Sequence, residues 1–165
     1  MRLHVPISLR WSDLDAYGHV NNAAMFGLLE EARIHAFWAG EAEFAGTAET
    51  TVSAAAPVTR IFRGGPDADT ITLIACQQAE YVAPIPYLRD PLDVEMWIGA
   101  LGGASMDVCY EIYSPPGVLP RVLFARAQTT IVVIDTATQK PRRLTDEERG
   151  VIEQIVDAPV VFRER

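Results

Sequence analysis

The segment from Trp11 to Asn22 contains most of the residues of this chain that could do chemistry. It holds two carboxylates, Asp13 and Asp15, with a glycine, a histidine and two asparagines, directly before a run of helix-forming residues. The first N–H groups of a helix lack intrahelical partners, and the helix dipole stabilises a carbonyl oxygen that gains negative charge there. An aspartate, normally ionised at neutral pH, could attack that carbonyl or activate a water. The segment therefore contains the groups that acyl transfer needs.

The same residues also suit a turn followed by a helix cap. Asp13 and Asp15 are typical turn residues, and Gly18 can take a positive φ. Asn21 or Asn22 can cap the helix that follows. Residue types and spacing alone favour neither interpretation.

Two elements flank this segment. Alternating apolar residues from His4 to Trp11 predict a half-buried strand, in which Pro6 indicates an edge or a strand start. Good helix formers from Ala23 to Ala39, apolar on most sides, predict a buried helix that stops at Gly40. The polar segment is then the loop that joins this strand to this helix.

Residues 41–69 are rich in Ala, Thr, Gly and Pro and are expected to be mostly loop, with a strand near Val58 to Phe62. Four further strands are expected at Thr70–Val82, Leu92–Leu101, Met106–Tyr113 and Val122–Ile134. The second and third of these should each have one wet face. The last strand should let the long helix lie close, because small side chains such as Ala125 and Ala127 share one of its faces.

A short surface helix is expected near the C-terminus, where Thr145 begins a capping box with Glu148 and Pro159 ends the segment. The order of elements is a strand, a helix and then a run of strands. This order predicts an α+β fold in which one curved, mostly antiparallel sheet wraps around one long central helix.

Composition limits the function classes. The 165 residues are 49% hydrophobic, which suits a single domain over residues 1–165. Acidic residues outnumber basic ones by 22 to 14, which argues against a nucleic-acid partner. There is no secretory signal pattern and no apolar run of membrane-spanning length, so a cytoplasmic protein without a membrane partner is expected. Cys76 and Cys109 stand alone in strand-like stretches, which predicts buried structural thiols and no metal or redox site.

The motif from Arg10 to Asn22, followed by Leu28–Arg33, resembles the signature of hotdog-fold acyl-CoA thioesterases of the 4-hydroxybenzoyl-CoA thioesterase-like family. The branch that it resembles carries the pattern Asp-x-Asp-x-x-Gly-His-Val-Asn-Asn. The likeness continues through Tyr81–Leu92, Arg126–Asp135 and Lys140–Leu144, and so covers nearly the whole chain. Residues 41–69 match poorly.

The resemblance implies hydrolysis of an acyl-CoA thioester to a free acid and CoA, without a cofactor or metal. The family's catalytic carboxylate falls on Asp15, as nucleophile or general base, and Asp13 would be the supporting acid. The backbone N–H of Asn22 or of a neighbour would stabilise the oxyanion at the start of the helix. His19 and Asn21 could orient a water or the aspartate.

Substrate contacts are expected from Tyr17 and Gly18 of the motif and from arginines that meet the phosphates of CoA. Arg89 and Arg126 are the main candidates. Arg142 and Arg143 are further candidates, although with Lys140 they also resemble a solvated strand exit. The resemblance also implies a homodimer or homotetramer with active sites built from two subunits.

Two other functions remain open at this point. A hotdog enoyl-CoA hydratase or dehydratase would use His19 and a helix glutamate to move protons. The helix glutamates, however, have structural partners at helical spacing, Glu30 with Arg33 and Glu31 with His35. A non-catalytic hotdog module that binds acyl-CoA is the other alternative.

Overall fold

The computed structural model describes residues 1–39, 61–63 and 67–163. Most of the stretch 41–69, including most of the strand expected near Val58 to Phe62, lies outside these residues. At the border of this stretch, β2 (Trp38–Ala39) and β3 (Phe62–Arg63) pair in parallel. None of the described helices is long and apolar enough to cross a membrane.

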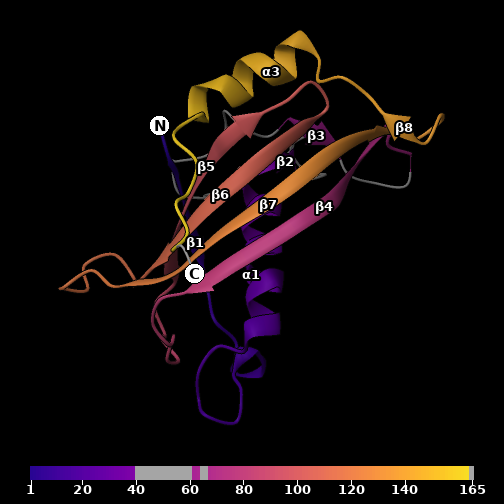
Figure 1. Ribbon diagram of the computed structural model, residues 1–165. Coiled ribbons are helices and arrows are strands. Elements are labelled where there is room, and N and C mark those ends of the chain that lie inside the picture. The colour runs from indigo at the N-terminus through magenta and orange to yellow at the C-terminus, as the bar shows by residue number, and fades with distance from the viewer. Residues whose placement is uncertain (40–60, 64–66, 164–165) are drawn as a thin grey trace, which may run out of the picture.

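One curved antiparallel sheet of six strands forms the body of the molecule (Figure 1). Its order is β1-β5-β6-β7-β4, with β8 paired to β7. The strands are β1 (Leu3–Ile7), β4 (Thr70–Tyr81), β5 (Leu92–Leu101), β6 (Ser105–Tyr113), β7 (Leu123–Asp135) and β8 (Lys140–Pro141). The four strands expected after residue 69 are therefore confirmed with small shifts at their ends, whereas the two-residue β8 was not expected.

The first strand is shorter than its alternation predicts, because it ends at Ile7 and not at Trp11. Trp11 instead begins a 3-10 turn, η1 (Trp11–Asp13). The carboxylate of Asp13 accepts a hydrogen bond from the Arg10 N–H (2.7 Å), and the Asp13 N–H donates back to the Arg10 carbonyl (3.0 Å). These reciprocal bonds close a turn where the apolar pattern alone suggests an extended chain.

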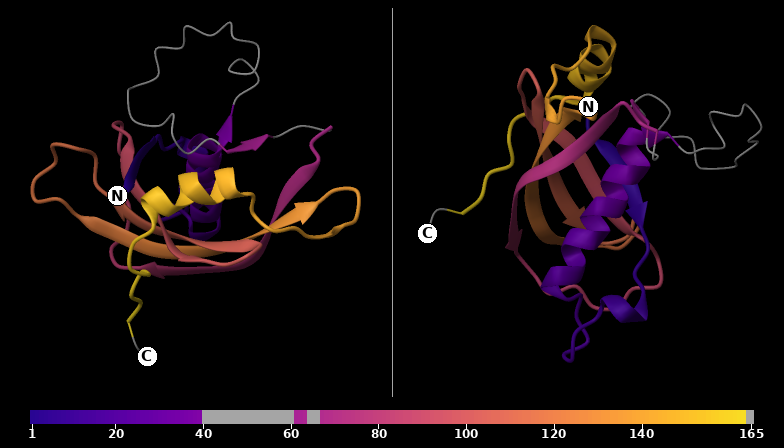
Figure 2. Two further views of the ribbon diagram at one scale, coloured as in Figure 1. Left: turned by 90° about the horizontal axis from the view of Figure 1, so that it is seen from above. Right: turned by 90° about the vertical axis from the view of Figure 1, so that its right-hand side faces the viewer.

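The long helix α1 (Asn22–Phe37) lies against the concave face of the sheet, as expected (Figure 2). Its buried side chains, among them Met25 and Phe37, meet a floor of small residues on β7 that includes Ala125 and Ala127, each 1% exposed. Small side chains on β7 leave room for the large buried side chains of the helix. This α+β arrangement, with a sheet wrapped around a central helix, is that of the hotdog fold.

Arg33 is the one charged residue of α1 that points into this core among the described residues. It is 3% exposed, and its Nη1 donates to the hydroxyls of Tyr110 (3.1 Å) and Thr129 (3.5 Å). The expected pairing of Arg33 with Glu30 is therefore wrong. Glu31 also has its partner outside the helix, since its carboxylate lies 3.6 Å from the guanidinium of Arg10, which precedes α1 in the chain.

The outer, convex face of the sheet is only partly exposed to solvent. After α3 (Asp146–Ile152) and η2 (Glu153–Ile155), residues 156–163 run across this face (Figure 2). The Trp97 indole N–H donates to the Ala158 carbonyl (2.7 Å), and Trp97, Cys109 and Val160 form a second small apolar cluster. A Cβ at Gly99, the site of a bulge in β5, would lie 2.5 Å from the Cys109 sulfur. The same Cβ would lie 3.0 Å from the Cα of Pro159, so the absence of a side chain at Gly99 leaves room for the C-terminal segment.

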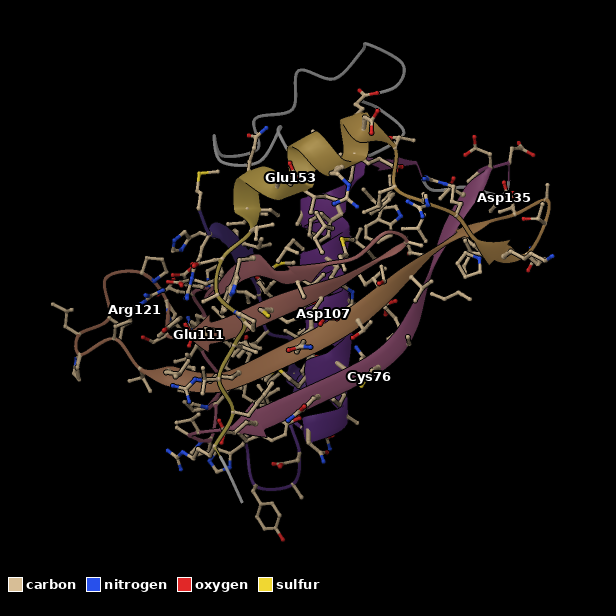
Figure 3. The ribbon with its side chains drawn as sticks, turned by 45° about the horizontal axis from the view of Figure 1, so that its top comes forward. Cys76, Asp107, Glu111, Arg121, Asp135 and Glu153 are labelled. Atoms are coloured by element: carbon tan, nitrogen blue, oxygen red, sulfur yellow. The ribbon has the colours of Figure 1, made fainter. Side chains whose placement is uncertain are left out.

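The two cysteines differ in burial. Cys109 is buried under the C-terminal segment, as expected. Cys76 is exposed on β4, so the expectation of a buried thiol is wrong there (Figure 3). The reason is topological, since β4 is an edge strand of the sheet.

The C-terminal helix has the predicted capping box, and it adds an ion pair. Thr145 and Glu148 exchange side chain to backbone hydrogen bonds, and Arg142 makes a bidentate pair with the Glu148 carboxylate at 2.6 and 2.9 Å. Burial is the largest influence on the pKa of Glu148 and would raise it, but the hydrogen bonds from Arg142 and Thr145 and the Arg142 charge together lower that pKa below the usual glutamate value. Arg142 is therefore held in an ion pair.

We expect Glu148→Gln to lower stability near neutral pH by about 1 kcal/mol, a fall in Tm of about 2–4 °C. Gln keeps the capping box, so the loss reports the charge. A lowered pKa in the folded state means that the stabilisation is full above the unfolded-state pKa of about 4.5 and disappears as the pH falls through the folded-state value. The Tm difference from wild type should therefore shrink at pH 3. A difference that is equal at both pH values, or the same effect from the neighbouring control Glu147→Gln, would contradict the ion-pair explanation.

Candidate active site

A tight hairpin holds Asp15. The backbone of Leu14 pairs with that of Val20, and the Asp15 N–H donates to the His19 carbonyl (2.7 Å). At the tip, the Gly18 N–H donates to the Asp15 carbonyl (3.1 Å), and Gly18 has a φ of 77°. Only glycine takes this conformation without strain, so the motif's glycine closes the turn.

The Asp15 carboxylate is fixed by one oxygen and open at the other. Its Oδ1 accepts the backbone N–H groups of Tyr17 (2.8 Å) and His19 (3.1 Å). No described residue donates to Oδ2. The side chain is also partly exposed. One oxygen thus orients the carboxylate, and the other is available to a carbonyl carbon or to a water.

Asp13 has a different environment, although it is only two residues away. It is 3% exposed, and its two oxygens take the backbone N–H and the guanidinium of Arg10. The Asp13 carbonyl accepts the Asn21 N–H (2.8 Å), which joins the turn to the helix start. Asp13 therefore supports the loop and offers no open oxygen.

The start of α1 follows directly. Asn21 is the N-cap, and its side-chain oxygen accepts the Ala23 N–H (2.8 Å). No described residue accepts the Asn22 N–H, which is the first amide of the helix. The carbonyl of Asn22, unlike its N–H, has a side-chain partner, since the Tyr81 hydroxyl at the end of β4 donates to it (3.0 Å). The free amide lies where the partial positive charge of the helix is greatest.

A second loop holds the motif from the side. The Val20 N–H donates to the carbonyl of the buried Ile85 (2.9 Å), and His19 pairs with Pro86. No described residue bonds to the His19 ring. Tyr17 projects into solvent at the hairpin tip and is 85% exposed. The backbone of the motif is therefore held by hydrogen bonds, whereas the Tyr17 ring is free in solvent and the His19 ring is partly exposed.

The two arginine candidates for phosphate binding lie in different places. Arg89 is exposed in the loop after Ile85, near the motif. Arg126 lies on the opposite face of the sheet from α1, where its guanidinium contacts Glu111 (3.3 Å) and Glu80 (3.5 Å). It lines a cavity of about 450 Å³ beneath the C-terminal segment. The structure does not bring Arg126 together with Asp15.

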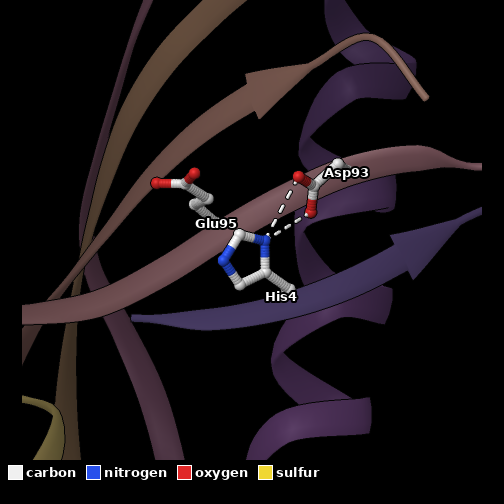
Figure 4. Close-up of side chains that lie close together, drawn as sticks. All are labelled: His4, Asp93 and Glu95. Carbon is white, nitrogen blue, oxygen red and sulfur yellow. Dashed lines mark hydrogen bonds and ion pairs between the residues drawn. The ribbon is translucent and has the colours of Figure 1, made fainter. Parts of the chain in front are cut away.

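One group of possible metal ligands lies on the outer face, in His4, Asp93 and Glu95, whose ligand atoms lie within 4.8 Å of one another (Figure 4). The carboxylates already have partners, since Arg121 donates to both of them and Arg2 donates to Glu95 (3.1 Å). We therefore interpret this group as an ion-pair network and assign no metal to it.

Three contacts of the site were not expected from the sequence: the Tyr81 bond to Asn22, the Arg10 pair with Asp13 and the stacking of Trp11 on Tyr87. The Arg10–Asp13 spacing of three residues is a recognisable local signal. The Tyr81 bond joins residues 59 positions apart and has no such signal.

Comparison with known proteins places this site in a family. The model of the thioesterase-like superfamily matches residues 9–164, and no match was found among the curated proteins. The YbaW probable thioesterase from Escherichia coli is 27% identical, with a TM-score of 0.64 over 94% of this chain and 99% of that one. A predicted thioesterase from Bacillus stearothermophilus is 20% identical, with a TM-score of 0.66 over 97% and 100% of the two chains.

Slr0204, a 1,4-dihydroxy-2-naphthoyl-CoA thioesterase from Synechocystis, is 17% identical, with a TM-score of 0.63 over 94% of this chain and 98% of that one. At this identity the likeness concerns the fold. The superfamily match, by contrast, spans nearly the whole chain and includes the hairpin of Asp15 and the start of α1. The chain belongs to the thioesterase-like superfamily, with the hotdog fold.

Proposed function

We propose that this protein hydrolyses acyl-CoA thioesters to a free carboxylic acid and CoA, with Asp15 as the catalytic carboxylate. The observation that supports the proposal is that one short segment contains both a carboxylate with one unbound oxygen and a helix N–H group without a described acceptor. Asp15 keeps one oxygen open, and the Asn22 N–H, seven residues later at the start of α1, has no described acceptor.

The two groups have complementary roles. The thioester oxygen would accept the Asn22 N–H, which with the helix dipole stabilises the negative charge that develops on it. As a general base, Asp15 would take a proton from a water that adds to the acyl carbon; the carbon–sulfur bond then breaks, and the CoA thiolate leaves and takes up a proton. As a nucleophile, the Asp15 carboxylate would itself bond to the acyl carbon as the carbon–sulfur bond breaks and CoA leaves, and water would then hydrolyse the resulting anhydride to the free acid and Asp15. Asp13 and Asn21 hold the backbone that carries both groups.

A second copy of this chain is the expected partner. The edge strand β4 is 12 residues long, and three of its apolar side chains are unusually exposed: Ile71 (37%), Leu73 (52%) and Ile74 (44%). An edge of this kind is a template for pairing with another strand. A partner that paired along the whole length of β4 would also reach Tyr81, whose hydroxyl donates to the Asn22 carbonyl at the helix start. We expect light scattering to give the mass of a dimer or tetramer, and a monomer would contradict this assembly.

The test is a panel of short, long and aromatic acyl-CoA substrates with the intact protein, in which a thiol-reactive dye measures CoA release. We expect release from at least one acyl class. Hydration of an enoyl-CoA without thiol release would replace the proposal with a hydratase. Tight acyl-CoA binding without release across the panel would indicate a non-catalytic binding module.

A further inference from the structure

An exposed aromatic pair lies beside the Asp15 hairpin. The rings of Trp11 and Tyr87 are stacked, with centroids 4.4 Å apart and planes inclined by 15°. Trp11 is nevertheless 74% exposed, so the ring face that turns away from Tyr87 is open. The stack fixes the indole and leaves one flat apolar surface in contact with water.

This pair is attached to the site from both sides. Trp11 begins η1, which ends at the buried Asp13, and it precedes Asp15 by four residues. Four residues can span at most about 14 Å. Tyr87 directly follows Pro86, whose backbone pairs with His19 in the hairpin of Asp15. A flat group stacked on Trp11 would therefore lie within reach of a flexible arm that ends at Asp15.

The surroundings suit an anion. Arg89 is exposed two residues after Tyr87, and no carboxylate of the described residues pairs with it. Arg10 directly precedes Trp11 and is bound by Asp13 and Glu31, so of these two arginines Arg89 is the one available to an added negative charge. A ligand with a flat ring and nearby phosphates matches this combination, because stacking and phosphate contacts would act together.

We propose that Trp11 stacks on the adenine ring of CoA and that Arg89 meets its phosphates. This inference rests on the proposed function, since the thioester must then lie at Asp15. It deepens that function by assigning a binding site to the nucleotide of CoA, because an acyl group on a pantetheine arm without a nucleotide would have nothing to stack on Trp11.

The test compares two substrates that share one acyl group, the CoA thioester and the N-acetylcysteamine thioester, which lacks the nucleotide. In Trp11→Leu we expect KM for the CoA thioester to rise about 10-fold with a small change in kcat, as for lost uniform binding. In wild type, KM should be lower for the CoA thioester than for the N-acetylcysteamine thioester, and in Trp11→Leu the ratio of these two KM values should move toward one. Trp11→Phe, which keeps a flat ring, should restore most of the ratio.

Two controls make the result specific. Leu119→Ala removes an apolar side chain that is even more exposed (87%) than Trp11 (74%), from a loop outside the motif, and the ratio should stay at the wild-type value. Adenosine 3′,5′-bisphosphate gives a reading without turnover, since calorimetry should detect its binding to wild type and a loss of about 10-fold in Trp11→Leu.

Equal effects of Trp11→Leu on both substrates, or no binding of the bisphosphate to wild type, would overturn the adenine site. A changed oligomeric mass in Trp11→Leu would also overturn it and would place a partner subunit on the ring. If wild type binds the bisphosphate but hydrolyses no thioester, the proposed function fails and the nucleotide site stands.

Discussion

Replacing Asp15 by Asn should lower kcat by about 10²–10⁴-fold while KM for the thioester changes little, because the carboxylate acts on the reacting atoms in the transition state. Asn keeps an oxygen that can accept the N–H groups of Tyr17 and His19, so the hairpin should stay closed. Turnover measured with the thiol-reactive dye, beside a thermal unfolding curve, separates lost chemistry from lost fold.

The matched control is Asp107→Asn. Asp107 lies on β6, far along the chain from the motif (Figure 3). Its carboxylate accepts the hydroxyl of Thr130 on β7 (2.7 Å), and Asn can keep that bond. We expect its turnover to equal that of wild type. Undiminished hydrolysis in Asp15→Asn would remove Asp15 from the mechanism.

Replacing Tyr110 by Phe should destabilise the protein by about 1.5–3 kcal/mol, the usual cost of removing a hydrogen bond to a buried charged group. Tyr110 is fully buried, and its hydroxyl accepts from the buried guanidinium of Arg33 (3.1 Å). Phe fills nearly the same volume, so the loss reports the missing acceptor. Denaturant unfolding with an unchanged m-value would measure it.

The companion variant Arg33→Met should cost less than Tyr110→Phe or even stabilise the protein. It removes the charge together with its need for acceptors, and an apolar side chain of similar length can fill the space. A larger loss in Arg33→Met than in Tyr110→Phe would show that the guanidinium contributes net stability. The double variant would then measure the coupling between the two residues.

Local patterns predict the elements of this fold well. The alternation along β5 and the capping box at Thr145 are properties of neighbouring residues, and they place both ends of β5 and the start of α3 to the residue. The end of α3 at Ile152 comes earlier than the expected stop at Pro159. The motif likewise carries its own geometry, since Gly18 and Asn21 fulfil local backbone needs that their residue types reveal. These features need no knowledge of the tertiary structure.

Features that depend on contacts between distant residues were missed, because local patterns contain no information about which distant residue comes near. Helical spacing suggests a pair for Arg33 with Glu30, but its acceptor Tyr110 lies 77 residues away on the sheet. The alternation of β6 correctly separates two faces, yet it does not reveal that the C-terminal segment covers Cys109 on the outer one. Apolar periodicity shows which residues face apart, and not which segment later covers them.

The unequal exposure of the two cysteines has a practical consequence for kinetics. A thiol-reactive dye will label the exposed Cys76 of an unpaired β4, giving a rapid signal that does not grow with substrate, whereas a partner strand on β4 would slow this labelling. Cys109 should stay silent, because burial raises the pKa of its thiol and the C-terminal segment shields it. Rapid labelling of a second thiol per chain would therefore indicate that the C-terminal segment lifts from the sheet and exposes Cys109. Only the slower signal that depends on substrate would measure the release of CoA.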